Sequence, residues 1–162
     1  MNRIICKTVR WLEGVISRIA PLSWLYMSPY RPIVQREVEL ANIRSGEHVL
    51  QIGAGSIPYT AVYIAEMADV YVTAIDRDRL AVERGRRWIE RMGASDRVQV
   101  MHDDGMNCPL SNIAAVFIAL QVEPKEKVMD YIMVKGAPGL KVVVREPSVR
   151  YSSQYDPIPD KW

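Results

Sequence analysis

Residues 51–60 read QIGAGSIPYT and join an apolar segment, HVLQIG, to a stretch with helical periodicity. Gly53 and Gly55 can adopt backbone angles closed to other residues and carry no Cβ, so a ligand can lie against the main chain there. Pro58 suits a first helical turn, where its missing N–H is not needed. A glycine-rich turn between a strand and a helix predicts a ligand-binding loop. Pro58 replaces the third glycine of the GxGxxG pattern, so a purely structural turn is the alternative.

Strand-like and helix-like segments alternate on both sides of this turn. The expected strands are residues 48–53, 70–76, 98–102, 114–120 and 141–146. The segment after Pro58 and residues 79–93 and 125–136 have the periodicity of helices. Short apolar strands alternating with helices predict a mainly parallel sheet covered on both faces. We therefore predict a Rossmann-like three-layer α/β/α fold with strand order 3-2-1-4-5 and N-terminal helices.

The N-terminal region is expected to be helical. Residues 3–20 carry apolar side chains at three- and four-residue steps, which predicts an amphipathic helix ended by Pro21. Its stripe would cover a sheet face, meet a second subunit or lie on a lipid surface, in that order of preference. A second helix is expected from Pro32 to about Asn42, with an apolar stripe of Ile33, Val34, Val38 and Ala41. We divide the chain into a helical segment (1–44), a core domain (45–147) and an extended tail (148–162).

Acidic residues follow the second and third expected strands. Asp76 ends the second strand, where its carboxylate would lie beside the glycine turn and accept hydrogen bonds from both ribose hydroxyls of a nucleoside. A helix N-cap is the alternative role for Asp76, and the two roles are compatible. Arg77 and Asp78 are expected to face solvent.

The other strand ends complete this candidate site. Asp104 follows the third strand and can accept a hydrogen bond from an adenine amino group, while Gly105 lets the backbone turn beneath the ring; Asp103 is the alternative acceptor. Ala119 and Leu120 end the fourth strand, at the edge of the sheet where open α/β folds bind ligands.

On these motifs the chain resembles the class I S-adenosylmethionine-dependent methyltransferases over Val49 to Arg145. QIGAGS is similar to the glycine motif of that family, although an acidic residue usually stands where Gln51 is, and AIDRD and HDDG are similar to its acidic and adenine motifs. The resemblance implies S-adenosyl-L-methionine as cofactor. The implied cofactor-binding residues are Gln51, Gly53, Ala54, Gly55, Ser56, Ile57, Asp76, Arg77, Asp103, Asp104, Gly105, Ala119 and Leu120.

A narrower resemblance joins two segments of the core domain. GAGSIPYT and FIALQVEPKEKVM are similar to the corresponding segments of nicotianamine synthases and related archaeal proteins. Those enzymes use the same cofactor but transfer its aminocarboxypropyl group. The resemblance therefore leaves three functions open: a methyltransferase, an aminocarboxypropyl transferase and a non-catalytic cofactor-binding module.

Composition narrows the function further. Two cysteines and two histidines without metal-ligand spacing predict no metal site and suit the reducing cytoplasm. NAD binding is disfavoured because the residues after Gly55 would crowd a pyrophosphate and HDDG has no role there. No apolar run reaches the ~20 residues of a transmembrane helix, and the charge-interrupted N-terminus is a poor signal peptide.

The sequence gives weaker signals for partners and catalytic residues than for the cofactor. The net charge is +2, and the first 36 residues carry six basic side chains against one acidic, which hints at a nucleic acid or membrane surface. A solvated polar face is the preferred explanation. We expect a small-molecule or otherwise unidentified acceptor. The edge of the fifth strand could be covered by the tail, the N-terminal helix or a second subunit, and we predict a homodimer. Glu123, Tyr30 and Glu37 are candidate general bases, and no catalytic residue is assigned.

Overall fold

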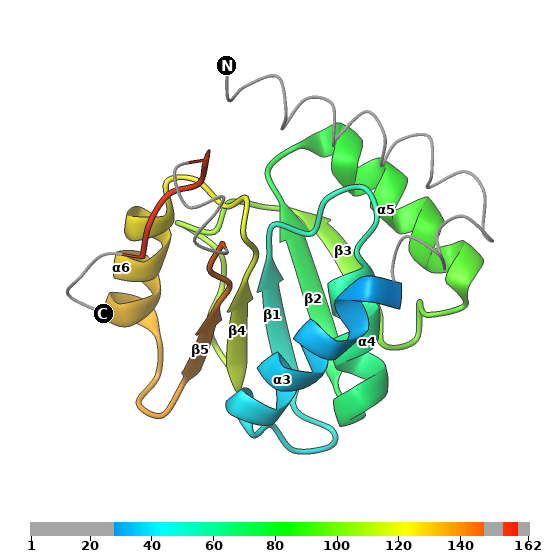
Figure 1. Cartoon of the computed structure of the whole chain (residues 1–162), viewed down its shortest axis with the longest axis horizontal. Coiled ribbons are helices and arrows are strands. Elements are labelled where there is room, and N and C mark those ends of the chain that lie inside the picture. Colours follow the sequence, from blue (N-terminus) through cyan, green and yellow to red (C-terminus); the bar gives the residue numbers. More distant parts are fainter. Residues whose placement is uncertain (1–27, 148–153, 159–162) are drawn as a thin grey trace.

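The computed structural model describes residues 28–147 and 154–158 and shows one twisted sheet flanked by helices (Figure 1). The strands are β1 (His48–Ile52), β2 (Tyr71–Asp76), β3 (Val98–His102), β4 (Ala115–Ile118) and β5 (Lys141–Val144). They are arranged in the order β3-β2-β1-β4-β5, and every neighbouring pair is parallel. The predicted Rossmann-like topology is therefore confirmed, with each strand end within a few residues of its expected place.

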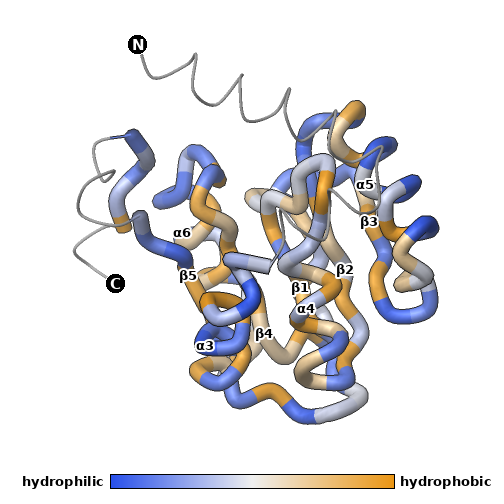
Figure 2. Tube along the Cα trace, turned by 45° about the vertical axis from the view of Figure 1, so that its right-hand side comes forward, coloured by the Kyte–Doolittle hydropathy of each residue, from blue (hydrophilic) through white to orange (hydrophobic). Residues whose placement is uncertain are grey.

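The helices pack on opposite faces of the sheet. They are η1 (Ser28–Tyr30), α3 (Arg31–Ala41), α4 (Tyr59–Ala68), α5 (Arg79–Met92) and α6 (Lys125–Lys135). Helices α3, α4 and α5 share one apolar cluster with one face of the sheet, and α6 shares a second cluster with the other face. In Figure 2 the outward turns of α5 are mainly hydrophilic, as expected of a helix that buries a single stripe.

The side chains of β1 show how the sheet divides the core. Val49 belongs to the cluster of α3, α4 and α5, whereas Leu50 and Ile52 belong to the cluster of α6. Successive residues of a strand point to opposite faces, so a strand buried on both sides must be apolar throughout. Gln51 breaks the apolar run of β1 yet is only 3 % exposed, which marks it as a residue with another task.

One face of the sheet is less covered than expected. The connection from β3 to β4, residues 103–114, contains no helix. On that side of the sheet Tyr71 is 41 % and Met101 is 38 % exposed. A crossover this short cannot lay a helix over β2 and β3, so the expectation of full cover on both faces is wrong at this corner.

Helix α3 differs from its predicted apolar stripe. Ile33 is 44 % exposed, whereas Glu37 is buried beside Val34 and Ala41. The carboxylate of Glu37 points into the protein because the guanidinium of Arg145 donates to it there. Apolar periodicity alone does not predict this pairing. The helix predicted at residues 3–20 and most of the predicted tail lie outside the described residues.

Strand β5 forms one edge of the sheet, as predicted from the strand order. Within residues 28–147 and 154–158, no helix has the length and apolar character needed to cross a lipid bilayer.

Candidate functional site

The glycine turn joins β1 to α4 and is tied to β2. The backbone N–H groups of Gly53 and Ala54 both donate to the carbonyl of Ile75, at 2.9 and 3.0 Å. Gly53 and Gly55 have φ angles of 85° and 67°, in the left-handed region that favours glycine. Helix α5 approaches the turn so closely that a Cβ on Gly85 would lie 3.2 Å from the carbonyl oxygen of Gly55.

Replacing Gly53 with alanine should lower the free energy of unfolding by about 2–4 kcal/mol. The new Cβ would stand in a left-handed conformation and lie 2.8 Å from Val122 Cγ2 and 3.1 Å from Ala119 Cβ. Gly46→Ala is the matched control, since Gly46 also has a positive φ of 81° but no atom within 4 Å of its Cβ position. Urea denaturation should show a clearly larger loss for Gly53→Ala; equal losses would contradict the crowding.

Asp76 closes the turn with its carboxylate. One oxygen accepts from the N–H of Gly55 at 2.8 Å, and the other accepts from the N–H of Asp78 at 2.9 Å. The helix N-cap is Asp78 instead, whose side chain accepts from the N–H groups of Leu80 and Ala81. The alternative role suggested for Asp76 therefore belongs to its neighbour, and Asp78 lines a cavity where we had expected it to face solvent.

The turn after β3 is stabilised by the side chains of its own aspartates, Asp103 and Asp104. The N–H of Asp103 donates to the carbonyl of Asp76 at 3.2 Å, which ties β3 to β2. The Asp103 side chain accepts from the N–H of Asp104, and the Asp104 side chain accepts from the N–H of Met106. Gly105 is required because a Cβ there would lie 2.7 Å from Ile52 Cγ2. Asp103 and Asp104 both reach the same cavity, so the structure leaves both as candidate acceptors.

Cys108 lies just past this turn and is 1 % exposed. Burial, and then the negative charge of Asp103, raise the pKa of its thiol from 9.0 to about 11. In a Cys6→Ser variant, Cys108 should react with a thiol reagent at pH 8 roughly 100-fold more slowly than free cysteine. Rapid modification of the folded protein would contradict its burial.

The same raised pKa predicts how stability depends on pH. The folded thiol holds its proton more tightly than the unfolded thiol, so its contribution is fully present below pH 9 and is lost as the pH rises towards 11. Urea denaturation at pH 8 and pH 11 should show a larger loss in the Cys6→Ser protein than in a Cys6→Ser/Cys108→Ala protein, which keeps only the contributions of other groups with raised pKa values, such as Tyr63 and Tyr131.

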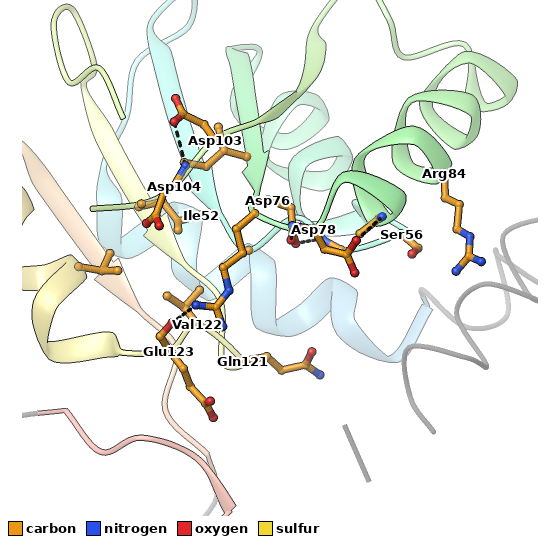
Figure 3. A pocket seen from close by; sticks show the side chains of 17 residues that line it. Ile52, Ser56, Asp76, Asp78, Arg84, Asp103, Asp104, Gln121, Val122 and Glu123 are labelled. Carbon is orange, nitrogen blue, oxygen red and sulfur yellow. Dashed lines mark hydrogen bonds between the residues drawn. The ribbon is translucent and has the colours of Figure 1, made fainter. Parts of the chain in front are cut away.

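These strand ends surround a first cavity of about 110 Å³ (Figure 3). The predicted residues that line it are Gly53, Gly55, Ser56, Asp76, Arg77, Asp103, Asp104 and Gly105. The guanidinium of Arg77 donates to the carbonyl of Glu123 at 2.8 Å, from the end of β2 to the loop after β4. Ser56, Asp78 and Arg84 lie along the α5 side in Figure 3, opposite Asp104 and Ile52.

A second cavity of about 580 Å³ lies on the other side of the glycine turn. Its lining includes the remaining predicted residues, which are Gln51, Ala54, Ile57, Ala119 and Leu120. Gly53, Gly55 and Gln121 line both cavities. The predicted set is thus brought together around one turn but is divided between two hollows.

Aromatic and charged residues form the rest of the second cavity. Tyr30, Tyr59, Arg145 and Tyr155 come from η1, α4, the end of β5 and the C-terminal segment. Of the candidate bases, Tyr30 lines the second cavity and Glu123 lines the first. Arg145 and Tyr155 were missed, because nothing in the sequence says that residues so far past the glycine turn fold back to it.

Glu37 and Arg145 form a buried ion pair beside this cavity. Both carboxylate oxygens of Glu37 accept from the guanidinium at 2.7 Å, and Arg145 lines the cavity. Burial alone would lower the pKa of Arg145, but the hydrogen bonds and charge of Glu37, together with Tyr59, outweigh it and raise the pKa. The guanidinium of Arg145 is therefore held in its charged form, and its hydrogen bonds to Glu37 give the cavity a fixed polar wall.

Gln51 also faces this cavity, with an unused acceptor. Its Oε1 atom is buried, and within the described residues it has no hydrogen-bond partner. A buried acceptor without a partner costs roughly 1–3 kcal/mol, which makes Gln51 Oε1 a candidate acceptor for a ligand donor in this cavity. The first cavity supplies carboxylates for hydroxyl or amino groups, and the second supplies an acceptor for an ammonium group. These features fit the nucleoside and amino-acid ends of S-adenosylmethionine. The described residues contain no group of three or more potential metal ligands.

The known proteins with similar sequences are longer than the part of them that this chain matches. An L-histidine 2-aminobutanoyltransferase of Yersinia pestis is 24 % identical over 120 residues, covering 74 % of this chain and 45 % of the relative. A protein-L-isoaspartate O-methyltransferase of Thermococcus sibiricus is 40 % identical over 68 residues, covering 42 % of this chain and 30 % of the relative. The chain thus spans less than half the length of these curated relatives.

Solved structures share the fold at low identity. A point mutant of MtNAS, a nicotianamine synthase, was solved in complex with S-adenosylmethionine and superposes with a TM-score of 0.82 at 20 % identity, over 98 % of this chain and 64 % of that one. An RNA methyltransferase from Salinibacter ruber, in complex with S-adenosyl-L-homocysteine, gives 0.64 at 22 % identity, over 71 % and 74 % of the two chains. Both likenesses establish the fold that was predicted from the strand order.

The family model that matches describes the protein-L-isoaspartate(D-aspartate) O-methyltransferases and covers residues 27–122, which is more than half of the chain. The match includes the glycine turn, Asp76, Asp104 and the end of β4, and so spans the lining of the first cavity except for Glu123 and Val128. It ends before α6, β5 and Arg145. This chain belongs to the protein-L-isoaspartate(D-aspartate) O-methyltransferase family, among the class I S-adenosylmethionine-dependent methyltransferases.

Proposed function

We propose that the chain binds S-adenosylmethionine and transfers its methyl group to an acceptor held in the second cavity. The observation that carries this proposal is the Asp76 carboxylate, fixed beside the glycine turn at the mouth of the first cavity. Each of its oxygens accepts one backbone N–H and has capacity left for a ribose hydroxyl. Family membership and the fit of the two cavities support the same assignment.

The sulfonium of this cofactor makes its methyl carbon open to attack by a lone pair, with the thioether as leaving group. The task of the protein is to hold the acceptor in line and to keep water out, which can contribute up to about 7–11 kcal/mol in favourable cases. Gly53 and Gly55 line both cavities, so the main chain of the turn would lie against the reacting centre. Gln51 would accept a hydrogen bond from the ammonium group of the amino-acid arm.

Aminocarboxypropyl transfer is the second candidate. The Yersinia pestis relative is named an aminobutanoyltransferase, and its match covers 120 residues against 68 for the Thermococcus methyltransferase. MtNAS superposes over 98 % of the chain and so includes β5 and Arg145, which the family match leaves out. This similarity supports an acceptor site that includes the region of β5 and Arg145.

One experiment separates these functions. The purified chain is incubated with methyl-labelled S-adenosylmethionine and a cell extract, and the nucleoside products are analysed. S-adenosylhomocysteine together with a labelled acceptor would support methyl transfer, whereas methylthioadenosine would support the second candidate. Calorimetric binding without either product would identify a non-catalytic binding module. Absence of binding would overturn the proposal.

We further infer that the protein is a cytoplasmic homodimer. The two cysteines without metal-binding spacing suit a reducing compartment. Strand β5 is an edge strand with every residue only partly buried, and unpaired strand edges commonly pair with another chain. Light scattering after gel filtration should give twice the mass of one chain, and a monomer at micromolar concentration would contradict the dimer.

A further inference from the structure

Lys125, the first residue of α6, is completely buried, although the proposed reaction gives it no task. Its ammonium group donates to the carbonyl of Leu120 and to the carbonyl of Asp156, both at 3.2 Å. Its backbone N–H donates to a side-chain oxygen of Asp156, also at 3.2 Å. A charge taken out of water is costly unless it is well paired, so a lysine here needs a reason.

The two segments that Lys125 joins both form walls of the second cavity. Leu120 and Gln121 belong to the loop after β4, and Tyr155 belongs to the C-terminal segment, next to the residue that Lys125 binds. Gln121 also lines the first cavity. The Lys125 side chain thus links these two walls directly, although it lines neither cavity.

In the part of the chain that the structure describes, the ammonium group of Lys125 is bound by main-chain carbonyl groups and not by a carboxylate. No carboxylate oxygen within the described residues lies within ion-pair distance of Lys125. Burial lowers the pKa of Lys125, against the opposing charges of Asp156, Glu123 and Glu146. Ile158 packs against the same apolar cluster as α6, which anchors the far end of the segment.

We propose that Lys125 is a positioning residue that holds the C-terminal segment, residues 154–158, against the loop after β4. It thereby shapes the wall of the second cavity against which the amino-acid arm of the cofactor would lie. This inference rests on the proposed function for the identity of the ligand. The clamp itself is independent of it, because its hydrogen bonds join two parts of the chain. Lys125 would act through Leu120 and Tyr155 and would not touch the reacting atoms.

The test compares two ligands that share the nucleoside. S-adenosylhomocysteine carries the amino-acid arm, whereas 5′-methylthioadenosine lacks it. In Lys125→Met the Kd for S-adenosylhomocysteine should rise at least about tenfold, while the Kd for methylthioadenosine should change by less than about twofold. Lys127→Met is the matched control, since Lys127 is an exposed lysine of the same helix, and it should leave both values unchanged.

Hydrogen exchange gives a second reading that needs no ligand. Lys125→Met should speed exchange at the amides of Tyr155 and Asp156 and leave α5 unchanged. Equal changes for both ligands, or unchanged exchange at these amides, would overturn the clamp. If Lys125→Met fails to fold, Asp156→Ala removes the side-chain acceptor of the Lys125 backbone N–H and should shift the two Kd values in the same direction by a smaller amount, because the ammonium group keeps its two main-chain acceptors. If the wild-type chain fails to bind S-adenosylhomocysteine, the proposed function falls, and the exchange data still decide the clamp.

Discussion

Asp76→Ala should lower the affinity for S-adenosylhomocysteine at least 100-fold in calorimetry. The carboxylate is expected to accept hydrogen bonds from both ribose hydroxyls, and each charge-assisted bond is worth about 1.5–3 kcal/mol. A loss of about 3 kcal/mol corresponds to roughly a 100-fold rise in Kd. The substitution also leaves the N–H of Gly55 without its acceptor, which loosens the turn itself.

The control for this prediction must remove a carboxylate without touching the site. Asp96 is exposed and precedes β3. It therefore lies at the amino ends of the parallel strands, opposite to the carboxyl ends where the glycine turn lies. Asp96→Ala should therefore leave the Kd within about twofold. Asp76→Asn keeps the shape but replaces one acceptor oxygen with a donor, so its affinity should fall between those of the wild type and Asp76→Ala. Wild-type affinity in both Asp76 variants would show that the nucleoside lies elsewhere.

The parts of the molecule that could be predicted from the sequence are those encoded locally. Strand periodicity and the turn at Gly53 and Gly55 were enough for the sheet order, because parallel strands with right-handed crossovers allow few topologies. Asp76 and Asp104 could be placed at the first cavity because the carboxyl ends of parallel strands share one edge.

What could not be predicted depends on pairings between distant segments. Glu37 and Arg145 lie 108 residues apart, and each is a common surface residue when viewed alone. The α3 stripe was assigned from apolar residues, so Ile33 was placed inside and the charged Glu37 was passed over as a core residue. Lys125 was missed for the same reason, since its acceptors are main-chain carbonyls that leave no trace in the sequence.

Glu37→Ala should lower the free energy of unfolding by about 3–5 kcal/mol. The substitution leaves the guanidinium of Arg145 buried without a counter-charge, and removing one member of a buried ion pair typically has this cost. The Glu37 and Arg145 side chains are only 11 % and 15 % exposed, so water can replace little of the lost interaction. Urea denaturation at pH 7 measures the change.

A double variant tests whether the loss comes from the pair or from the position. Glu37→Met/Arg145→Met replaces both charges with flexible apolar side chains and should recover most of the stability, because the buried charge is gone. The exposed pair of Arg31 and Glu66, 4.0 Å apart, provides the reference, and Glu66→Ala should cost less than about 1 kcal/mol. The double variant should still lose ligands that depend on the polar wall of the second cavity, so recovered stability with lost binding of S-adenosylhomocysteine would locate the role of the pair in recognition. A double variant less stable than Glu37→Ala would contradict this assignment, since it would mean that packing, and not the unpaired charge, dominates at this site.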